Sequence, residues 1–99
     1  MGDRESKAGN RRQGAYRITV SNTAAKQLQQ LPPTDAKRIS RRIDALGSNP
    51  RPKGMEKLSG TDACRIRIGV YRVIYQIRDR ELLVLVLRVR HRKDAYRGL

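Results

Sequence analysis

The chain has 99 residues, of which 23 are Lys or Arg and 9 are Asp or Glu, so its formal net charge is +14 at pH 7. This length leaves room for one domain with one modest core. A charge of this size predicts a polyanionic partner: nucleic acid, an acidic protein or an anionic membrane surface. The longest aliphatic run, residues 82–87, is far too short to span a membrane, and no secretory leader is visible.

Cys64 is the single cysteine of the sequence, so no internal disulfide can form. Without a second Cys or a suitably spaced His, the sequence predicts no metal site. No Gly-rich phosphate loop is present either. We therefore expect a cytoplasmic protein that uses no cofactor, with Cys64 as a small residue of the core or of a sheet edge.

The N-terminal segment, residues 1–15, is polar and has no apolar periodicity, which predicts a disordered basic tail. Solvated terminal charges are the simpler interpretation of its "NRRQ" run, and contact with nucleic acid is the alternative. The folded domain is then expected to span residues 16–99.

A strand and two helices are predicted next. Apolar residues alternate over residues 16–20, and the period then changes to that of a helix capped by Ser21 or Asn22 and stopped by the proline pair at 32–33. A second helix begins at Thr34 and ends at Gly47. Basic residues share its outer face and point either to solvent or into the groove of an acidic partner: Lys37, Arg38, Arg41 and Arg42.

Three strands follow a loop over residues 48–64. The first two, "CRIRIG" and "YRVIYQI", alternate, whereas the third, "LLVLVLRV", is apolar on both faces. Such a strand belongs in the middle of a sheet that is covered on both sides. The predicted fold is a small single α+β domain with an N-terminal strand, an αα-hairpin and a three-stranded antiparallel meander that completes a four-stranded sheet.

Strand alternation predicts that guanidinium groups gather at one end of one sheet face. Arg65 and Arg67 alternate with Ile66 and Ile68, which must face the helices, and Arg72 lies on the arginine side. The third strand supplies the remaining cations: Arg88 and Arg90, which continue the face of Val84 and Val86, and Arg92, where the strand ends.

This convergence predicts a phosphate-binding site. Like charges across a sheet repel, so stability alone does not explain the set, whereas guanidinium groups offer paired donors to phosphate oxygens. The alternative is an exposed strand face whose arginines pack over apolar neighbours or pair with Asp62, Asp79 or Glu81. For any single arginine we favour this alternative. For the whole set we favour the phosphate site.

Metal-free phosphodiester transfer within RNA is the reaction that fits such a site. In this reaction a ribose 2′-OH attacks the adjacent phosphorus and the 5′ oxygen leaves. Arginines stabilise the added negative charge but do not carry protons, because a guanidinium pKa lies above about 12. Proton transfer then falls to Tyr96, His91, water or the RNA itself. Tyr96 can also stack on a base or anchor the C-terminal turn.

The chain resembles the RelE/ParE superfamily of toxins from toxin–antitoxin pairs. The resemblance rests on the order of elements and on two segments, "KLSGTDACRIRIGVYRVIYQI" (residues 57–77) and "LRVRHRKDAYR" (residues 87–97). The resemblance covers nearly everything from Tyr16 onward. In the RelE branch it implies a ribosome-dependent endoribonuclease, an mRNA interferase that cuts mRNA in the ribosomal A site and inhibits translation.

The resemblance also implies site residues and partners. By position, the family's catalytic residues fall on Arg65, Arg67, Arg72, Arg92 and Tyr96. Further RNA contacts are expected from Arg88, Arg90, His91 and Lys57. The implied partners are a cognate acidic antitoxin, the ribosome and mRNA, with no membrane and no small-molecule cofactor.

Two other functions remain open for the same fold. One is a ParE-like toxin that inhibits DNA gyrase through protein contact, without cutting RNA. The other is a basic RNA-binding module without catalysis. The fold alone does not choose among the three. The set of arginines backed by a tyrosine favours the endoribonuclease, because a gyrase-directed surface needs no phosphate site.

Overall fold

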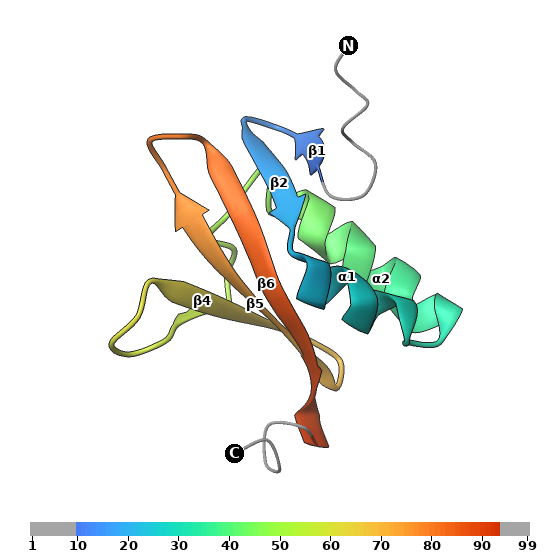
Figure 1. Cartoon of the computed structure of the whole chain (residues 1–99). Coiled ribbons are helices and arrows are strands. Elements are labelled where there is room, and N and C mark those ends of the chain that lie inside the picture. Colours follow the sequence, from blue (N-terminus) through green and yellow to red (C-terminus); the bar gives the residue numbers. More distant parts are fainter. Residues whose placement is uncertain (1–9, 94–99) are drawn as a thin grey trace.

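The computed structural model describes residues 10–93, with side chains from residue 14 onward. One six-stranded sheet has the order β1-β2-β6-β5-β4-β3, and two helices lie on one of its faces (Figure 1). β2 and β6 are parallel, and all other neighbouring strands in this sheet are antiparallel. The elements are β1 (Asn10–Gln13), β2 (Tyr16–Val20), α1 (Asn22–Gln29), α2 (Pro33–Ala45), β3 (Glu56–Lys57), β4 (Ala63–Ile68), β5 (Tyr71–Arg78) and β6 (Leu83–His91).

The predicted α+β class is confirmed, but the sheet has two more strands than predicted. β3 forms inside the segment expected to be a loop and pairs with β4. β1 forms inside the segment expected to be a disordered tail and pairs with β2, so that prediction was wrong for Asn10–Gln13. Both are edge strands that form by backbone pairing with a neighbouring strand. Such pairing requires no alternation of apolar residues, so the sequence contains no signal for either strand. Residues 1–9 lie outside the described part.

The turn between β1 and β2 packs closely against the segment that follows α2. Gly14 has a φ of +68°, and a Cβ at this position would lie 2.6 Å from the Ser48 Cα. The Tyr16 amide donates to the Gly47 carbonyl at 3.0 Å. Glycine at position 14 is therefore required both by its backbone conformation and by the close approach of Ser48.

The helices begin largely as the sequence predicts. Ser21 caps α1, and its side-chain oxygen accepts a hydrogen bond from the Ala24 amide at 3.0 Å. α2 begins at Pro33, one residue earlier than predicted, because the first helical position tolerates a residue without an amide hydrogen. Ile39 and Ile43 are buried against the sheet side of the domain.

β6 lies inside the sheet, between β2 and β5, as its apolar sequence predicts. Val84 and Val86 are fully buried on the face that carries the helices. The prediction that both faces of this strand are covered was wrong for the described residues, since both helices lie on one face (Figure 1). On the opposite face, here called the open face, Leu83, Leu85 and Leu87 remain partly exposed.

The core of the domain lies between the helices and the sheet. Its buried members come from β2, both helices and the three long strands, and Cys64 is among them as predicted. Ile66 and Ile68 are 2% exposed and face the helices, which confirms the side assigned to them. Among the described residues, no helix is long and apolar enough to cross a membrane.

Candidate nucleic-acid interface

Strand pairing brings five arginines together on the open face. Arg67 of β4 lies opposite Arg72 of β5, and Arg72 lies opposite Arg90 of β6. In the adjacent row, Arg65 and Arg88 flank Ile74. We call this set the arginine cluster: Arg65, Arg67, Arg72, Arg88 and Arg90. It occupies the end of the sheet at which β6 ends (Figure 1).

An irregularity in β6 decides which side Arg88 and Arg90 occupy. Tyr75 pairs with Val86, whereas the preceding residue, Ile74, pairs with Arg88, so Leu87 is an extra residue on β6. A bulge of this kind reverses the alternation of side chains beyond it. The prediction that Arg88 and Arg90 continue the face of Val84 and Val86 was therefore wrong: the two valines face the helices, and the two arginines join the open face.

Side chains from neighbouring elements satisfy the backbone of this bulge. The Ser21 hydroxyl donates to the Leu87 carbonyl at 2.9 Å. The Gln27 side-chain oxygen accepts from the Val89 amide at 2.7 Å. Ser21 caps α1 and Gln27 lies in its last turn, beside the part of β6 that extends beyond its parallel partner β2. The helical layer thus holds the strand in the register that places the arginines on the open face.

The members of the cluster differ in how far they reach into solvent. Arg67 and Arg88 are exposed, whereas Arg72 and Arg90 are partly buried. The Arg65 side chain is 24% exposed and pairs through Nη2 with Oε1 of Glu56, its neighbour on β3. Its Nε is inaccessible and has no hydrogen-bond partner among the described residues. The cluster therefore offers solvent several guanidinium groups whose stems are held by the sheet.

Glu56 is a member of this site that sequence reasoning missed. The hydrogen bond from Arg65, followed by the charges of Arg65, Arg67 and Arg72, lowers the pKa of Glu56 below its usual value. Its position is set by pairing of β3 with β4. A two-residue strand has no periodicity, so the sequence contains no signal that places this carboxylate beside the cluster.

Arg92 lies just past the end of β6. Its backbone amide donates to the Val70 carbonyl in the β4–β5 turn at 2.6 Å, which fixes the start of the C-terminal segment at the same end of the sheet. The Arg92 side chain is exposed. Tyr96, the other predicted catalytic residue of this segment, lies outside the described residues.

His91 does not join the open face. It pairs with Tyr71 and shares the helix side of the sheet with Val89. Its ring meets the Tyr71 ring edge-on, with centroids 5.3 Å apart, and its Nδ1 accepts from the Lys93 amide at 3.0 Å. Tyr71 in turn donates to Asp35 at 2.8 Å, which raises the pKa of the Tyr71 hydroxyl. The imidazole thus belongs to a packing contact between the sheet and the N-terminus of α2.

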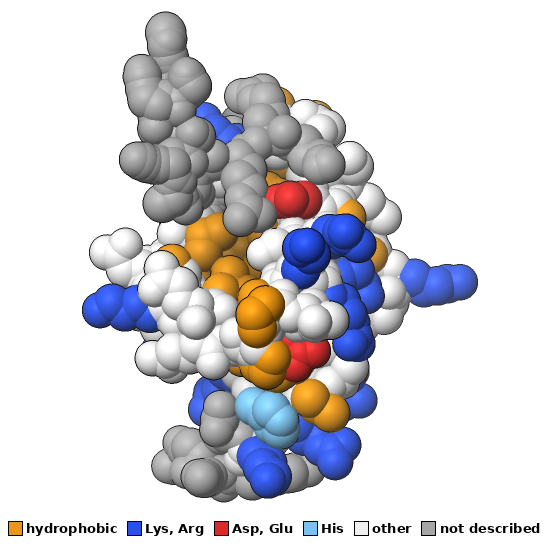
Figure 2. All heavy atoms as spheres, turned by 90° about the vertical axis from the view of Figure 1, so that its right-hand side faces the viewer, with side chains coloured by type: hydrophobic (Ala, Val, Ile, Leu, Met, Phe, Trp, Pro, Cys, Tyr) orange, Lys and Arg blue, Asp and Glu red, His pale blue; other side chains and the backbone are white. Residues whose placement is uncertain are grey.

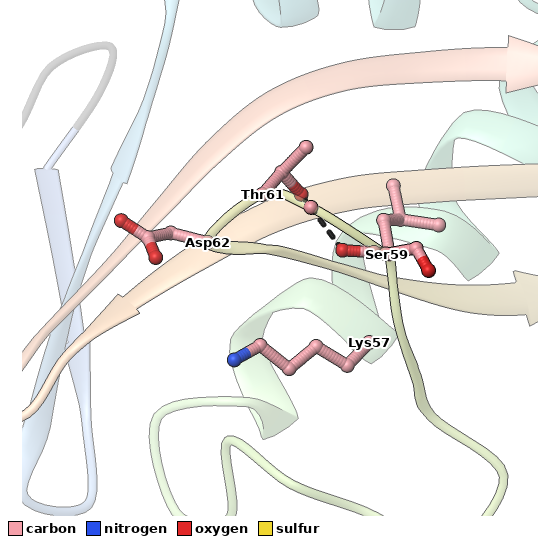
Figure 3. A pocket seen from close by; sticks show the side chains of 6 residues that line it. Lys57, Ser59, Thr61 and Asp62 are labelled. Atoms are coloured by element: carbon pink, nitrogen blue, oxygen red, sulfur yellow. Dashed lines mark hydrogen bonds between the residues drawn. The ribbon is translucent and has the colours of Figure 1, made fainter.

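Lys57 is also separate from the arginine cluster. It pairs with Cys64, so it takes the helix side of the sheet, whereas Glu56 takes the open face. Its side chain helps to line a concavity of about 510 Å³ formed by the β3–β4 loop, residues 57–62 (Figure 3). The Thr61 hydroxyl closes this loop by donating to the Leu58 carbonyl at 3.0 Å. None of the cluster arginines lines this concavity.

A second cationic surface lies on the opposite side of the molecule. Figure 2 shows this helical side, where Lys and Arg side chains gather along one edge over α2. The exposed members, here called the α2 stripe, are those predicted for the outer face: Lys37, Arg38, Arg41 and Arg42. Among residues 10–93, no group of three or more His, Cys, Asp or Glu side chains is placed to hold a metal ion.

Fold and sequence comparison together define the class of this protein, a toxin of a type II toxin–antitoxin system. The chain belongs to the ParE toxin family: the family model described as ParE toxin of type II toxin–antitoxin system, parDE, matches residues 18–96. This confirms the predicted RelE/ParE superfamily.

Solved structures similar to this chain carry the names RelE and RelBE2, and a similar toxin is named RelG. Toxin RelG of Mycobacterium tuberculosis is 35% identical over 86 residues, which make up 83% of this chain and 97% of that protein. The archaeal RelE–RelB complex from Pyrococcus horikoshii OT3 contains a chain that is 32% identical, with a TM-score of 0.67 and coverage of 74% of this chain and 90% of that chain. The toxin–antitoxin complex RelBE2 from Mycobacterium tuberculosis matches with the same TM-score at 29% identity, covering 74% of this chain and 93% of that chain.

Proposed function

We propose that this toxin is a ribosome-dependent endoribonuclease that cleaves mRNA in the ribosomal A site and thereby inhibits translation. The observation that carries the proposal is the row formed by Arg67, Arg72 and Arg90 across three strands of the open face, which neither helix covers. Like charges at directly paired positions reduce the stability of a sheet, and a bound RNA phosphate would offset this repulsion. Relatives named RelG and RelE support the RelE branch of the superfamily, for which the sequence resemblance implies a nuclease.

In the proposed reaction, the 2′-OH attacks the adjacent phosphorus and the 5′ oxygen leaves, without a metal ion. Arg67 and Arg72 stabilise the charge that develops on the phosphoryl oxygens, because fixed donors act most strongly where charge appears in the transition state. Arg65 and Arg92 bind the same phosphate, and Arg88 and Arg90 contact flanking phosphates. Tyr96 stacks on a base. We assign no role in this reaction to His91 and Lys57, because both take the helix side of the sheet.

In the proposed reaction, the ribosome orients the RNA strand for cleavage. Among the described residues, the arginine cluster lies on the sheet face opposite the two helices, so we expect the toxin alone to orient an RNA strand poorly. Holding reactants in the productive geometry contributes on the order of 7–11 kcal/mol in other systems. A codon presented by the ribosome provides this orientation, which places the activity in the cytoplasm.

An antitoxin is the proposed partner that inhibits the toxin. The structural relatives include RelE–RelB and RelBE2 complexes. With a net charge of +14, this chain favours an acidic segment that folds on binding and masks the arginine cluster.

A second candidate function, inhibition of DNA gyrase by protein contact, is favoured by the name of the matching family model. One set of assays separates the two. A translation reaction programmed with a defined mRNA is incubated with the toxin, and RNA 5′ ends are mapped with and without ribosomes. New ends inside A-site codons, formed only with ribosomes, support the nuclease. Intact mRNA together with loss of gyrase supercoiling activity supports the alternative.

A further inference from the structure

The arginine cluster needs a proton acceptor that arginine does not provide. When the 2′-OH attacks phosphorus, its proton must leave, and a guanidinium group does not give up its own proton to become a base at any working pH. An acid–base side chain beside the cluster would accept this proton more effectively than water or the RNA itself.

The histidine is on the wrong side of the sheet for this role. His91 shares a face with Val89 and packs against Tyr71, and its Nδ1 is engaged by the Lys93 amide. The sheet backbone lies between this ring and the cluster. Tyr71 and Tyr75 also take the helix side, where Tyr75 donates to the Pro50 carbonyl at 2.8 Å.

Glu56 is the one carboxylate that the described residues bring to the arginine cluster. β3–β4 pairing places it directly opposite Arg65 on the open face. Its side chain is 54% exposed, compared with 24% for Arg65, so it forms the solvent side of the ion pair. Arg65 engages Oε1, which leaves Oε2 available to accept a hydrogen bond from a bound ribose.

The position of Glu56 also suits the geometry of the reaction. Glu56 and Arg65 form one row across the strands, and Arg67 and Arg72 form the next row. Rows two residues apart along a strand are separated by roughly 7 Å. A phosphate on Arg67 and Arg72 thus places its ribose beside Glu56. A glutamate is ionised at neutral pH, as a proton acceptor must be, and the hydrogen bond from Arg65 and the nearby guanidinium charges lower its pKa further.

We propose that Glu56 is the catalytic proton acceptor of this toxin, an inference that rests on the proposed RNA cleavage. The O2′–H bond breaks as its proton passes to Oε2 of Glu56, and O2′ forms a bond to phosphorus. The P–O5′ bond breaks, and O5′ leaves with the electron pair and takes a proton from water. The products are a 2′,3′-cyclic phosphate and a 5′-hydroxyl, and Glu56 returns its proton to solvent.

Glu56→Gln separates proton transfer from the positioning of Arg65. Glutamine keeps an oxygen that accepts from Arg65 but does not take a proton at neutral pH. Single-turnover cleavage is measured on mRNA-programmed ribosomes at saturating toxin, for wild type, Glu56→Gln, Glu56→Ala and the control Glu81→Gln. Glu81 is an exposed carboxylate in the β5–β6 turn, at the other end of β5. We expect a loss of about 100-fold or more for Glu56→Gln, as for other general bases, and a wild-type rate for Glu81→Gln.

Two further readouts identify a base. Formate added to Glu56→Ala should restore part of the rate, because a small carboxylate replaces the missing proton acceptor, whereas Arg65→Ala should not respond. The wild-type rate should fall at acidic pH as Glu56 is protonated, and this fall should be absent from Glu56→Gln.

Each outcome of this experiment has a defined consequence. A wild-type rate in Glu56→Gln overturns the role of Glu56 while the proposed nuclease stands. A slow Glu56→Gln that keeps the wild-type pH profile, with no formate rescue of Glu56→Ala, means that Glu56 only positions Arg65 and also overturns the proposal. Absence of cleavage by the wild-type protein overturns the proposed function itself.

Discussion

Arg72 lies at the centre of the arginine cluster. It has an arginine on each side, Arg67 on β4 and Arg90 on β6, at directly paired positions. Adjacent like charges reduce the stability of a sheet. The proposed RNA phosphate would offset this repulsion, so we expect removal of Arg72 to affect chemistry more than folding.

Arg72→Ala should slow cleavage on programmed ribosomes by about 100- to 1000-fold under single-turnover conditions, corresponding to about 2.7–4 kcal/mol for one transition-state donor. Arg78→Ala is the matched control, since Arg78 lies on the same face of the same strand at its far end, opposite Leu83. Equal rates for the two variants would show that the phosphate site is placed wrongly.

Asp79 follows β5 at the end of the sheet away from the arginine cluster. It forms hydrogen bonds with β2 and with the loop after α2. The Tyr16 hydroxyl donates to Oδ1 at 2.6 Å, and the Arg51 guanidinium donates to both carboxylate oxygens, at 3.2 and 2.9 Å. The hydrogen bonds from Arg51 and Tyr16 lower the pKa of Asp79. A carboxyl group whose pKa is lower when folded contributes stability above its unfolded pKa, and the contribution is lost as pH falls through the folded pKa.

Asp79→Asn should therefore lower the Tm at neutral pH, and its difference from wild type should close as the pH falls below about 4, near the pKa of an unfolded aspartate. Asp62→Asn, a change to an exposed loop carboxylate, is the control. Thermal unfolding followed by circular dichroism over pH 3–8 gives the comparison. A deficit in Asp79→Asn that stays constant down to pH 3 would contradict the assigned ion pair.

At the level of elements, the bulge in β6 is the feature that builds the site. Leu87 is inserted between Val86, which faces the core, and Arg88, which faces the open side. Beyond Val86 the strand has no β2 neighbour, so Ser21 and Gln27 provide the hydrogen bonds that a partner strand would have made. The helical segment thus stabilises the part of the strand that carries the arginines.

Gln27→Ala should destabilise the domain, because it removes the acceptor of the Val89 amide in a partly buried place. The expected loss is about 1–3 kcal/mol, the usual effect of an unsatisfied buried donor. For a domain of this size, each kcal/mol lowers the Tm by about 4–8 °C. Gln29→Ala, two residues on in the same helix and exposed, is the control. If both variants melt together, the Gln27 hydrogen bond does not stabilise the bulge.

At the level of the whole molecule, positive charge is divided between two opposite faces. The arginine cluster occupies the open face of the sheet, and the α2 stripe occupies the outer surface of the helical layer (Figure 2). A molecule charged on both sides can contact phosphates of the ribosome with one face while the other engages the mRNA. We expect the two faces to differ in function, since only the sheet face contains the proposed catalytic groups.

The double variant Lys37→Ala/Arg41→Ala should weaken ribosome binding and reduce its salt dependence, with the slope of log K against log salt falling by about 0.7–0.9 for each phosphate that the variant no longer binds. Its cleavage rate at saturating toxin should match wild type, because chemistry at saturation is independent of affinity. Arg72→Ala should instead lower the cleavage rate at saturating toxin and change ribosome binding much less. A reduced saturated rate in the double variant would assign the α2 stripe to the chemistry.

Much of the fold and part of the site could be predicted from the sequence by itself. The alternation of Arg65 and Arg67 with Ile66 and Ile68 fixed their two faces, because strand geometry turns each successive side chain over. The Ser21 cap was identified because it precedes a change of period. The apolar run of β6 determined its place inside the sheet. All of these are local properties of the chain.

Only the tertiary structure decided how distant segments meet. β1 and β3 form because backbone groups pair with neighbouring strands, which requires no pattern of side chains. The extra residue at Leu87 is defined by the pairing of β6 with β5. It places Arg88 and Arg90 on the open face instead of the helix side. Glu56 met Arg65 for the same reason: cross-strand neighbours are set by register, and register depends on long-range pairing that no local period records.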